Sequence, residues 1–181
     1  MKKAAIFLAT GFEEIEAIGT IDVLRRGGVD VTLVTINDQA IVTGAHNIEI
    51  LSDSFFTEEE FSEFDALILP GGQPGSNNLK AFKPLGELLS KFYEQGKLLA
   101  AICAAPIVLG GLGLLAGRKA TCFPGYEAQL TGATIVDAPF VVDDNIITGK
   151  GPGMVLPFAL VILDYLEGKA TADDIESGLL P

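Results

Sequence analysis

The chain has 181 residues, 49% of them hydrophobic, which is long enough for one domain with a sizeable core. Acidic residues outnumber basic ones by 24 to 12, and no basic run interrupts the net charge of −12. This balance argues against nucleic acids and anionic membranes as partners, because both require a positively charged protein face.

The first half of the chain predicts a strand, a helix, a second strand and a β-hairpin, in that order. These elements are expected at residues 3–9, 13–26, 29–35 and 41–51, with 41–42 pairing with 48–51 through Gly44. Apolar residues recur at helical spacing and form the stripe of the helix: Ile15, Ile18, Ile21 and Leu24. Gly27 and Gly28 then end the helix.

The second half continues the alternation of strands and helices. Strands are expected at residues 66–69, 98–102, 119–122, 134–135, 141–142 and 146–147. Helices are expected at about residues 85–95 and 155–166, with another starting within 104–109. Such alternation implies right-handed crossovers. We therefore predict an α/β fold, a doubly wound, mostly parallel sheet flanked by helices, in one domain over residues 1–181.

Two apolar segments could be mistaken for targeting or membrane segments: one for a membrane span and one for a signal peptide. Residues 98–117 carry no charge and approach the ~20 residues of a membrane span, but they contain Pro106 and four glycines. The lysines and apolar run at the N-terminus resemble a signal peptide, yet Glu13 and Glu14 follow where a cleavage site would belong. We interpret residues 98–117 as a buried strand at 98–102 followed by the start of a helix at 104–109, and the N-terminal run as the first buried strand of a cytoplasmic protein.

Cys103 is the first candidate for chemistry. Sites in doubly wound sheets form at the carboxyl ends of strands, where we place the loops 10–16, 70–78 and 103–106. Cys103 directly follows a strand among small residues, and Pro106 lies in the first turn of a helix. A helix N-terminus at such an elbow favours a thiolate. A buried and inert cysteine fits the pattern equally well.

Acidic residues and glycines occupy the two other loops. Glu13 and Glu14 are expected at a helix start because they complement its dipole. Glu16 lies beside the apolar stripe, where an inward-turned carboxyl would be desolvated and would act as a general acid or base. The pattern alone favours a solvated Glu16. Gly71 and Gly72 predict a tight turn, whose N–H groups could also approach a substrate oxygen.

Metal and phosphate motifs are missing from the sequence. The only other cysteine, Cys122, forms no Cys-x-x-Cys pair with Cys103, and His46 is the single histidine. No glycine-rich phosphate loop occurs. We therefore expect no metal and no cofactor, and we interpret Cys122 as a small core residue.

Four motifs together resemble the ThiJ/PfpI superfamily, and most closely its branch with the parkinsonism-associated protein deglycase and bacterial relatives. They are GFEEIE at 11–16, LPGG at 69–72, AAICAAP at 100–106 and TGKGPG at 148–153. The resemblance implies a flavodoxin-like fold, a homodimer and no cofactor. It also implies that Cys103 is the reactive, oxidisable cysteine and Glu16 its protonated partner. Gly72 and Ala104 match positions whose N–H groups face the reacting oxygen.

One position departs from the family pattern. Relatives proposed as hydrolases or deglycases commonly carry a histidine before a proline after the elbow helix, where this chain has Phe123. A Cys–His peptidase pair is disfavoured, because the base that would take the proton is missing. His46 lies near a place where relatives put a basic pocket residue. An exposed loop histidine is the favoured interpretation.

By resemblance, the chain is expected to be a glyoxalase or protein deglycase that acts on methylglyoxal-type carbonyls or glycated protein adducts. Thiolate Cys103 would be the nucleophile and Glu16 the acid/base. The alternative is a non-catalytic oxidative-stress sensor or chaperone, in which Cys103 stops at the sulfinic acid. A cysteine peptidase or amidase is a third and weaker alternative.

Overall fold

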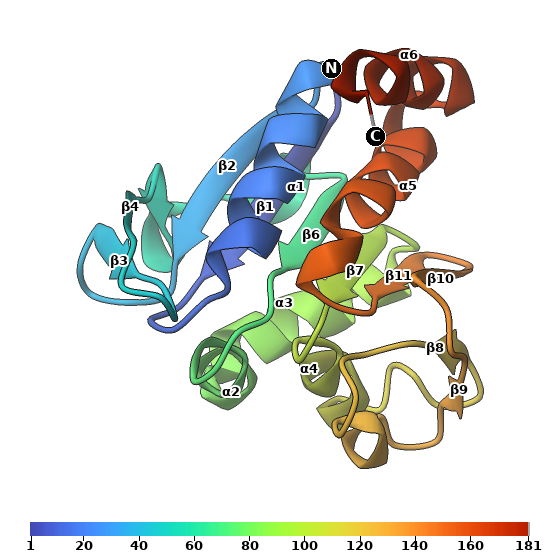
Figure 1. Ribbon diagram of the computed structural model, residues 1–181. Helices are drawn as coiled ribbons and strands as arrows, with labels where there is room; N and C mark the ends of the chain where they lie inside the picture. The colour runs from blue at the N-terminus through green and yellow to red at the C-terminus, as the bar shows by residue number, and fades with distance from the viewer. Residues whose placement is uncertain (181) are drawn as a thin grey trace.

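The computed structural model describes residues 1–180, apart from the side chain of Glu58, and is built on a seven-stranded sheet (Figure 1). The strand order is β10-β11-β7-β6-β1-β2-β5. Neighbouring strands are parallel except for β10, which is antiparallel to β11. The strands span Lys3–Leu8 (β1), Asp30–Thr35 (β2), Ser54–Phe55 (β5), Ala66–Leu69 (β6), Leu98–Ile102 (β7), Phe140–Asp143 (β10) and Ile146–Gly149 (β11).

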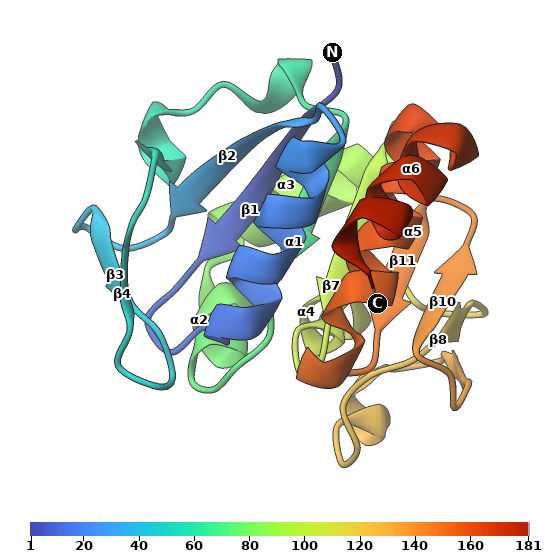
Figure 2. The same cartoon turned by 45° about the horizontal axis from the view of Figure 1, so that its top comes forward.

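Helices cover both faces of this sheet, as the alternating pattern predicted. The helices span Glu14–Arg26 (α1), Gly75–Ala81 (α2), Lys83–Glu94 (α3), Pro106–Gly111 (α4), Val155–Glu167 (α5) and Lys169–Leu179 (α6). Figure 2 shows α1, α5 and α6 on one side of the sheet and α3 and α4 on the other. Strand β1 is buried on both faces: Ile6 packs on the α1 and α5 side and Phe7 on the α3 side. This explains its uninterrupted apolar sequence.

Two small strand pairs lie outside the main sheet. The predicted hairpin is formed by β3 (Ile41–Thr43) and β4 (Glu49–Leu51), which are antiparallel. Residues 119–122 contribute only a short strand, β8 (Lys119–Ala120), which pairs in parallel with β9 (Thr134–Ile135). Four short 3-10 turns complete the chain, at Phe56–Glu58, Phe61–Glu63, Glu127–Gln129 and Pro152–Met154.

The predicted apolar stripe of α1 is only partly its buried face. Ile15 and Ile18 are 61% and 45% exposed, whereas Ile21 is buried. The helix turns another face to α5, because Gly19 and Gly27 lack side chains. A Cβ at Gly19 would lie 2.6 Å from the Val155 side chain, and one at Gly27 would lie 2.3 Å from that of Leu163. This close approach leaves Ile15 and Ile18 on the surface.

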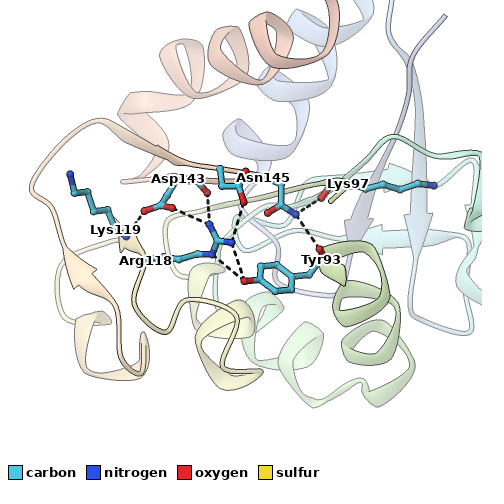
Figure 3. A network of polar contacts seen from close by, with 7 residues as sticks. Tyr93, Lys97, Arg118, Lys119, Asp143 and Asn145 are labelled. Atoms are coloured by element: carbon cyan, nitrogen blue, oxygen red, sulfur yellow. Dashed lines mark hydrogen bonds and ion pairs between the residues drawn. The ribbon is translucent and has the colours of Figure 1, made fainter. Parts of the chain in front are cut away.

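A polar network fixes the amino end of β7 (Figure 3). Arg118 donates to the Tyr93 hydroxyl at 3.0 and 3.2 Å and pairs with Asp143 at 3.0 Å. The Asn145 amide donates to the carbonyl of Lys97 at 2.9 Å. The network ties the β10–β11 turn to the end of α3 and to the segment before β8. It therefore fastens the sheet where β7 begins.

The apolar segment 98–117 divides into β7, the short helix α4 and turns, as predicted. Across residues 1–180, none of the helices combines the length and the apolar character that crossing a membrane would need.

Candidate active site

Cys103 lies at a sharp turn between β7 and α4, as the sequence predicted. Its φ is 64°, in the left-handed region that residues other than glycine rarely adopt. The turn is held on both sides: the N–H of Cys103 donates to Gly149 at 2.9 Å, and its carbonyl accepts from Phe123 at 2.8 Å. A strained residue of this kind persists only where its surroundings fix it, and the strain marks a functional position.

Glu16 lies beside Cys103 and is fully buried, with 0% exposure. Its Oε2 atom accepts the backbone N–H of Gly71 at 2.7 Å. Its Oε1 atom is also buried and finds no N–H or O–H donor among the described residues. The sequence pattern favoured a solvated Glu16, and that prediction is wrong. The carboxyl turns inward, as the alternative interpretation required.

Desolvation makes Glu16 a carboxyl that exchanges protons near neutral pH. It raises the pKa of Glu16 to about 7, against the opposing hydrogen bonds from Gly71 and from the Cys103 thiol. The charge of Glu13 adds to the rise. A group with a pKa near the working pH is suited to take a proton and to return it.

Burial favours the thiol form of Cys103. Desolvation raises its pKa to about 12, and the charge of Glu16 and a hydrogen bond to that carboxyl add to the rise. Burial therefore opposes the thiolate expected from the elbow, and its effect on the pKa of Cys103 exceeds that of the backbone donors at the helix N-terminus. Helix α4 has only six residues, so its dipole is small.

Two backbone donors point at the sulfur. The backbone N–H groups of Gly72 and Ala104 act on the Cys103 sulfur and oppose the rise in its pKa. Both are residues at which the resemblance places such donors. The N–H of Gly71 is instead taken by Glu16, so the expectation that Gly71 would bind a substrate oxygen is wrong. Gly71 positions the carboxyl.

A cavity of about 450 Å³ leads to the sulfur. It is lined by Glu13, Ile15, His46, Gly72, Gln73, Cys103, Ala104, Phe123, Tyr126 and Pro152. Cys103 is 8% exposed, so small molecules can reach it from solvent. Both residues suggested for the pocket, His46 and Phe123, line the cavity. Cys122 is a buried core residue outside it, with a pKa raised to about 11 by desolvation.

His46 is an exposed loop histidine bound to a buried carboxylate. Its side chain is 68% exposed, and its Nδ1 lies 2.9 Å from Oε2 of Glu14. Glu14 Oε1 accepts the backbone N–H of His46 at 2.7 Å. Burial opposes ionisation of Glu14, but the bonds from His46 outweigh it and lower the pKa of Glu14. Glu14 therefore holds the β3–β4 loop against α1. A glutamate that only complemented the helix dipole would not make these bonds.

Together with Glu13, these two residues form a group that could attract a cation. Glu13, Glu14 and His46 bring three ligand atoms within 4.8 Å of one another. The Nδ1 of His46 is already shared between Glu14 at 2.9 Å and Glu13 at 3.5 Å. A metal could bind here only by displacing the bond that holds the loop on α1.

Comparisons with known sequences identify the family of the chain. The sequence profile of the DJ-1/PfpI family matches residues 2–165. Protein DJ-1 homolog B of Arabidopsis thaliana is 40% identical over 99% of this chain, which spans only 41% of that protein. Protein dj-1beta of Drosophila melanogaster is 39% identical over 99% of the chain and 97% of its own length. The glutathione-independent glyoxalase DJR-1.2 of Caenorhabditis elegans is 39% identical, with coverages of 86% and 83%.

Solved structures share the fold of this chain. The crystal structure of Drosophila melanogaster DJ-1beta superposes with a TM-score of 0.95 at 39% identity, covering 99% of this chain and 97% of that one. A C103A variant of the DJ-1 superfamily protein STM1931 from Salmonella typhimurium also gives 0.95 at 39% identity, with coverages of 99% and 98%.

Proposed function

Because the chain belongs to the DJ-1/PfpI family, we propose that it is a glyoxalase- or deglycase-like enzyme that acts on methylglyoxal-type carbonyls or their adducts. One observation carries the proposal: a fully buried carboxyl with a pKa of about 7 touches a cysteine at the end of an open cavity. The relative named as a glutathione-independent glyoxalase supports the choice of reaction.

The first step joins the sulfur to the aldehyde. The Cys103 sulfur attacks the aldehyde carbon, and the electron pair of the C=O bond moves to oxygen. Glu16, in its carboxylate form, takes the thiol proton as the S–C bond forms, because the raised pKa of Cys103 prevents loss of the proton beforehand. The N–H groups of Gly72 and Ala104 receive the developing negative charge on oxygen.

The second step moves a proton between two carbons. Glu16 first gives the thiol proton to the oxyanion, which completes the hemithioacetal and restores the carboxylate. Glu16 then takes the proton from the carbon bound to sulfur and returns it to the neighbouring carbonyl carbon, through an enediol. The product is a lactyl thioester of Cys103. Water then cleaves the S–C bond, which releases lactate and returns the proton to sulfur. The sum is methylglyoxal plus water giving lactate, with no redox cofactor consumed.

A second candidate function uses the same sulfur as an oxidative-stress sensor. Oxidation of Cys103 to the sulfinic acid would create two oxygens beside a protonatable Glu16 and the N–H groups of Gly72 and Ala104. For Cys122, burial and the charge of Glu127 both raise the pKa, and none of the described residues opposes them as Gly72 and Ala104 do for Cys103. A peptidase is disfavoured, because Phe123 supplies no base and His46 is held by Glu14.

We also propose a cytoplasmic homodimer, since Ile15 and Ile18 on α1 and Ile48 beside β4 leave an apolar surface exposed. Free Cys103 and Cys122 fit a reducing compartment.

The test measures lactate formed from methylglyoxal in the absence of added thiol. Cys103→Ser and Glu16→Gln should each lose at least a hundredfold in kcat/KM, whereas Cys122→Ser should retain activity. Full turnover by either site variant would exclude the mechanism. Absence of turnover in the unmodified protein, together with selective gain of two oxygens on Cys103 under mild peroxide, would favour the sensor.

A further inference from the structure

The cavity above Cys103 is lined by an acidic residue, a histidine and two aromatic rings, among others. Glu13 comes from the turn between β1 and α1, and its side chain is 12% exposed. Phe123 and Tyr126 come from the segment after β8, where their rings form a T-shaped pair with centroids 6.5 Å apart. No lysine or arginine is among the lining residues that the structure describes.

The charge of this entrance is negative whatever the state of its histidine. Among the lining residues that the structure describes, His46 alone can carry a positive charge, and its Nδ1 lies 2.9 Å from Glu14 and 3.5 Å from Glu13. A protonated His46 is therefore balanced by Glu14. The carboxylate of Glu13 is then left without a cationic partner among the lining residues that the structure describes.

The aromatic pair adds a second attraction for cations. Phe123 is 42% exposed, so part of its ring is open to a ligand. The faces of aromatic rings carry negative potential and attract ammonium and guanidinium groups. A histidine at this position would instead be able to carry a positive charge.

We propose that this cavity selects substrates by charge, favouring carbonyl compounds with an ammonium or guanidinium group and disfavouring those with a carboxylate. Glu13 is the specificity-determining residue, and Phe123 provides the surface on which the cationic group rests. This selection rests on the proposed use of the cavity as the substrate site of Cys103. Neutral oxoaldehydes rank between these two groups.

A labelling experiment tests the charge selection without requiring turnover. In a Cys122→Ser background, Cys103 is treated with the 2-(trimethylammonio)ethyl or the 2-sulfonatoethyl methanethiosulfonate. Each rate is divided by that of the same reagent with a small free thiol. The corrected rate should favour the cation by roughly tenfold at low ionic strength and less in high salt.

Matched variants identify the residue responsible. Glu13→Gln should remove most of the cation preference, whereas Glu49→Gln, the same charge change at an exposed residue of β4, should leave it unchanged. A corrected ratio near one, or a ratio unaltered by Glu13→Gln, would overturn the proposal.

A turnover experiment separates this proposal from the proposed function. Phenylglyoxal, its 4-trimethylammonio derivative and its 4-carboxy derivative present one reacting group with three charges. We expect kcat/KM to fall in the order cation, neutral, anion, and Glu13→Gln to compress the series by roughly fivefold. Lack of turnover of all three would reject the proposed function and leave the labelling result to decide charge selection. Equal turnover of all three would reject charge selection alone.

Discussion

The carboxyl of Glu16 is bound at 2.7 Å to the backbone N–H of Gly71, two residues after β6 ends, while α1 carries it from the other side. A Cβ added to Gly71 would lie 2.6 Å from Oε2 of Glu16 and 2.6 Å from Cβ of Cys103. The absence of a side chain at Gly71 therefore allows the acid and the sulfur to meet.

Gly71→Ala should separate Glu16 from Cys103. We expect kcat/KM for methylglyoxal to fall by at least tenfold, with a loss of about 1–3 kcal/mol in unfolding free energy from overpacking. Steady-state kinetics and urea denaturation measure both effects. Gly178→Ala is the control, because a Cβ there meets nothing within 4 Å and alanine favours the helix. An active Gly71→Ala protein would contradict the positioning role.

Glu16→Gln should make the Cys103 thiol more acidic. In the unmodified protein, alkylation by iodoacetamide should have a midpoint above the ~8.5 of free cysteine, since burial and the Glu16 charge raise the pKa of Cys103. The neutral amide removes the charge, so the midpoint should move down. Mass spectrometry of Cys103 labelling across pH measures the shift. A midpoint below that of free cysteine in the unmodified protein would refute this assignment.

Ionisation of Glu16 should lower the free energy of unfolding at alkaline pH. Its folded pKa of about 7 exceeds that of an unfolded glutamate, so the native state prefers the proton. The stabilisation from the protonated form is complete below the unfolded pKa, ~4.3, and is lost as pH rises through about 7. Glu16→Gln should thus be more stable than the unmodified protein by on the order of 2 kcal/mol at pH 8, and equal to it at pH 4.5. Denaturant unfolding at both pH values decides this.

Ile18→Asp should disrupt the proposed homodimer. Ile18 is 45% exposed on α1, and a charge there would have to be desolvated in any apolar interface. Light scattering after size exclusion should detect monomers. Val142→Asp, equally exposed on β10, is the matched control and should not change the mass. Monomers for the unmodified protein would exclude the dimer.

Arg118→Met should destabilise the fold without affecting the site. The Arg118 side chain is 18% exposed and joins Tyr93 to Asp143 at the end of β7 farthest from Cys103. Its loss should cost about 1–2 kcal/mol, whereas Lys169→Met, in an exposed pair with Asp173, should cost almost nothing. Thermal unfolding gives the comparison. Unchanged stability in Arg118→Met would contradict the fastening role.

The features that depend on local sequence were predictable. Strands β1 and β7 are continuous apolar runs, and the elbow at Cys103 follows from a strand next to small residues and Pro106. Helix α6 gave no comparable signal, because Ala172 is its single buried residue in the described chain.

The features that depend on tertiary contacts were not predictable from the pattern. The buried face of α1 is set by Val155 and Leu163, which lie more than a hundred residues away from Gly19 and Gly27. The bond between Glu14 and His46 joins residues 32 positions apart. The pKa of Cys103 depends on how deeply the sulfur is buried, which spacing does not reveal.

The two edge strands of the main sheet, β5 and β10, are short, and this limits aggregation through the sheet edges. At one margin, β5 has only two residues, Ser54–Phe55. At the other, β10 has four, is followed directly by a tight turn and carries Asp143 in an ion pair. Edge strands this short offer few unpaired N–H and C=O groups to which a strand of another chain could bind. The protein is therefore guarded against cross-β aggregation even though its central strands are almost entirely apolar.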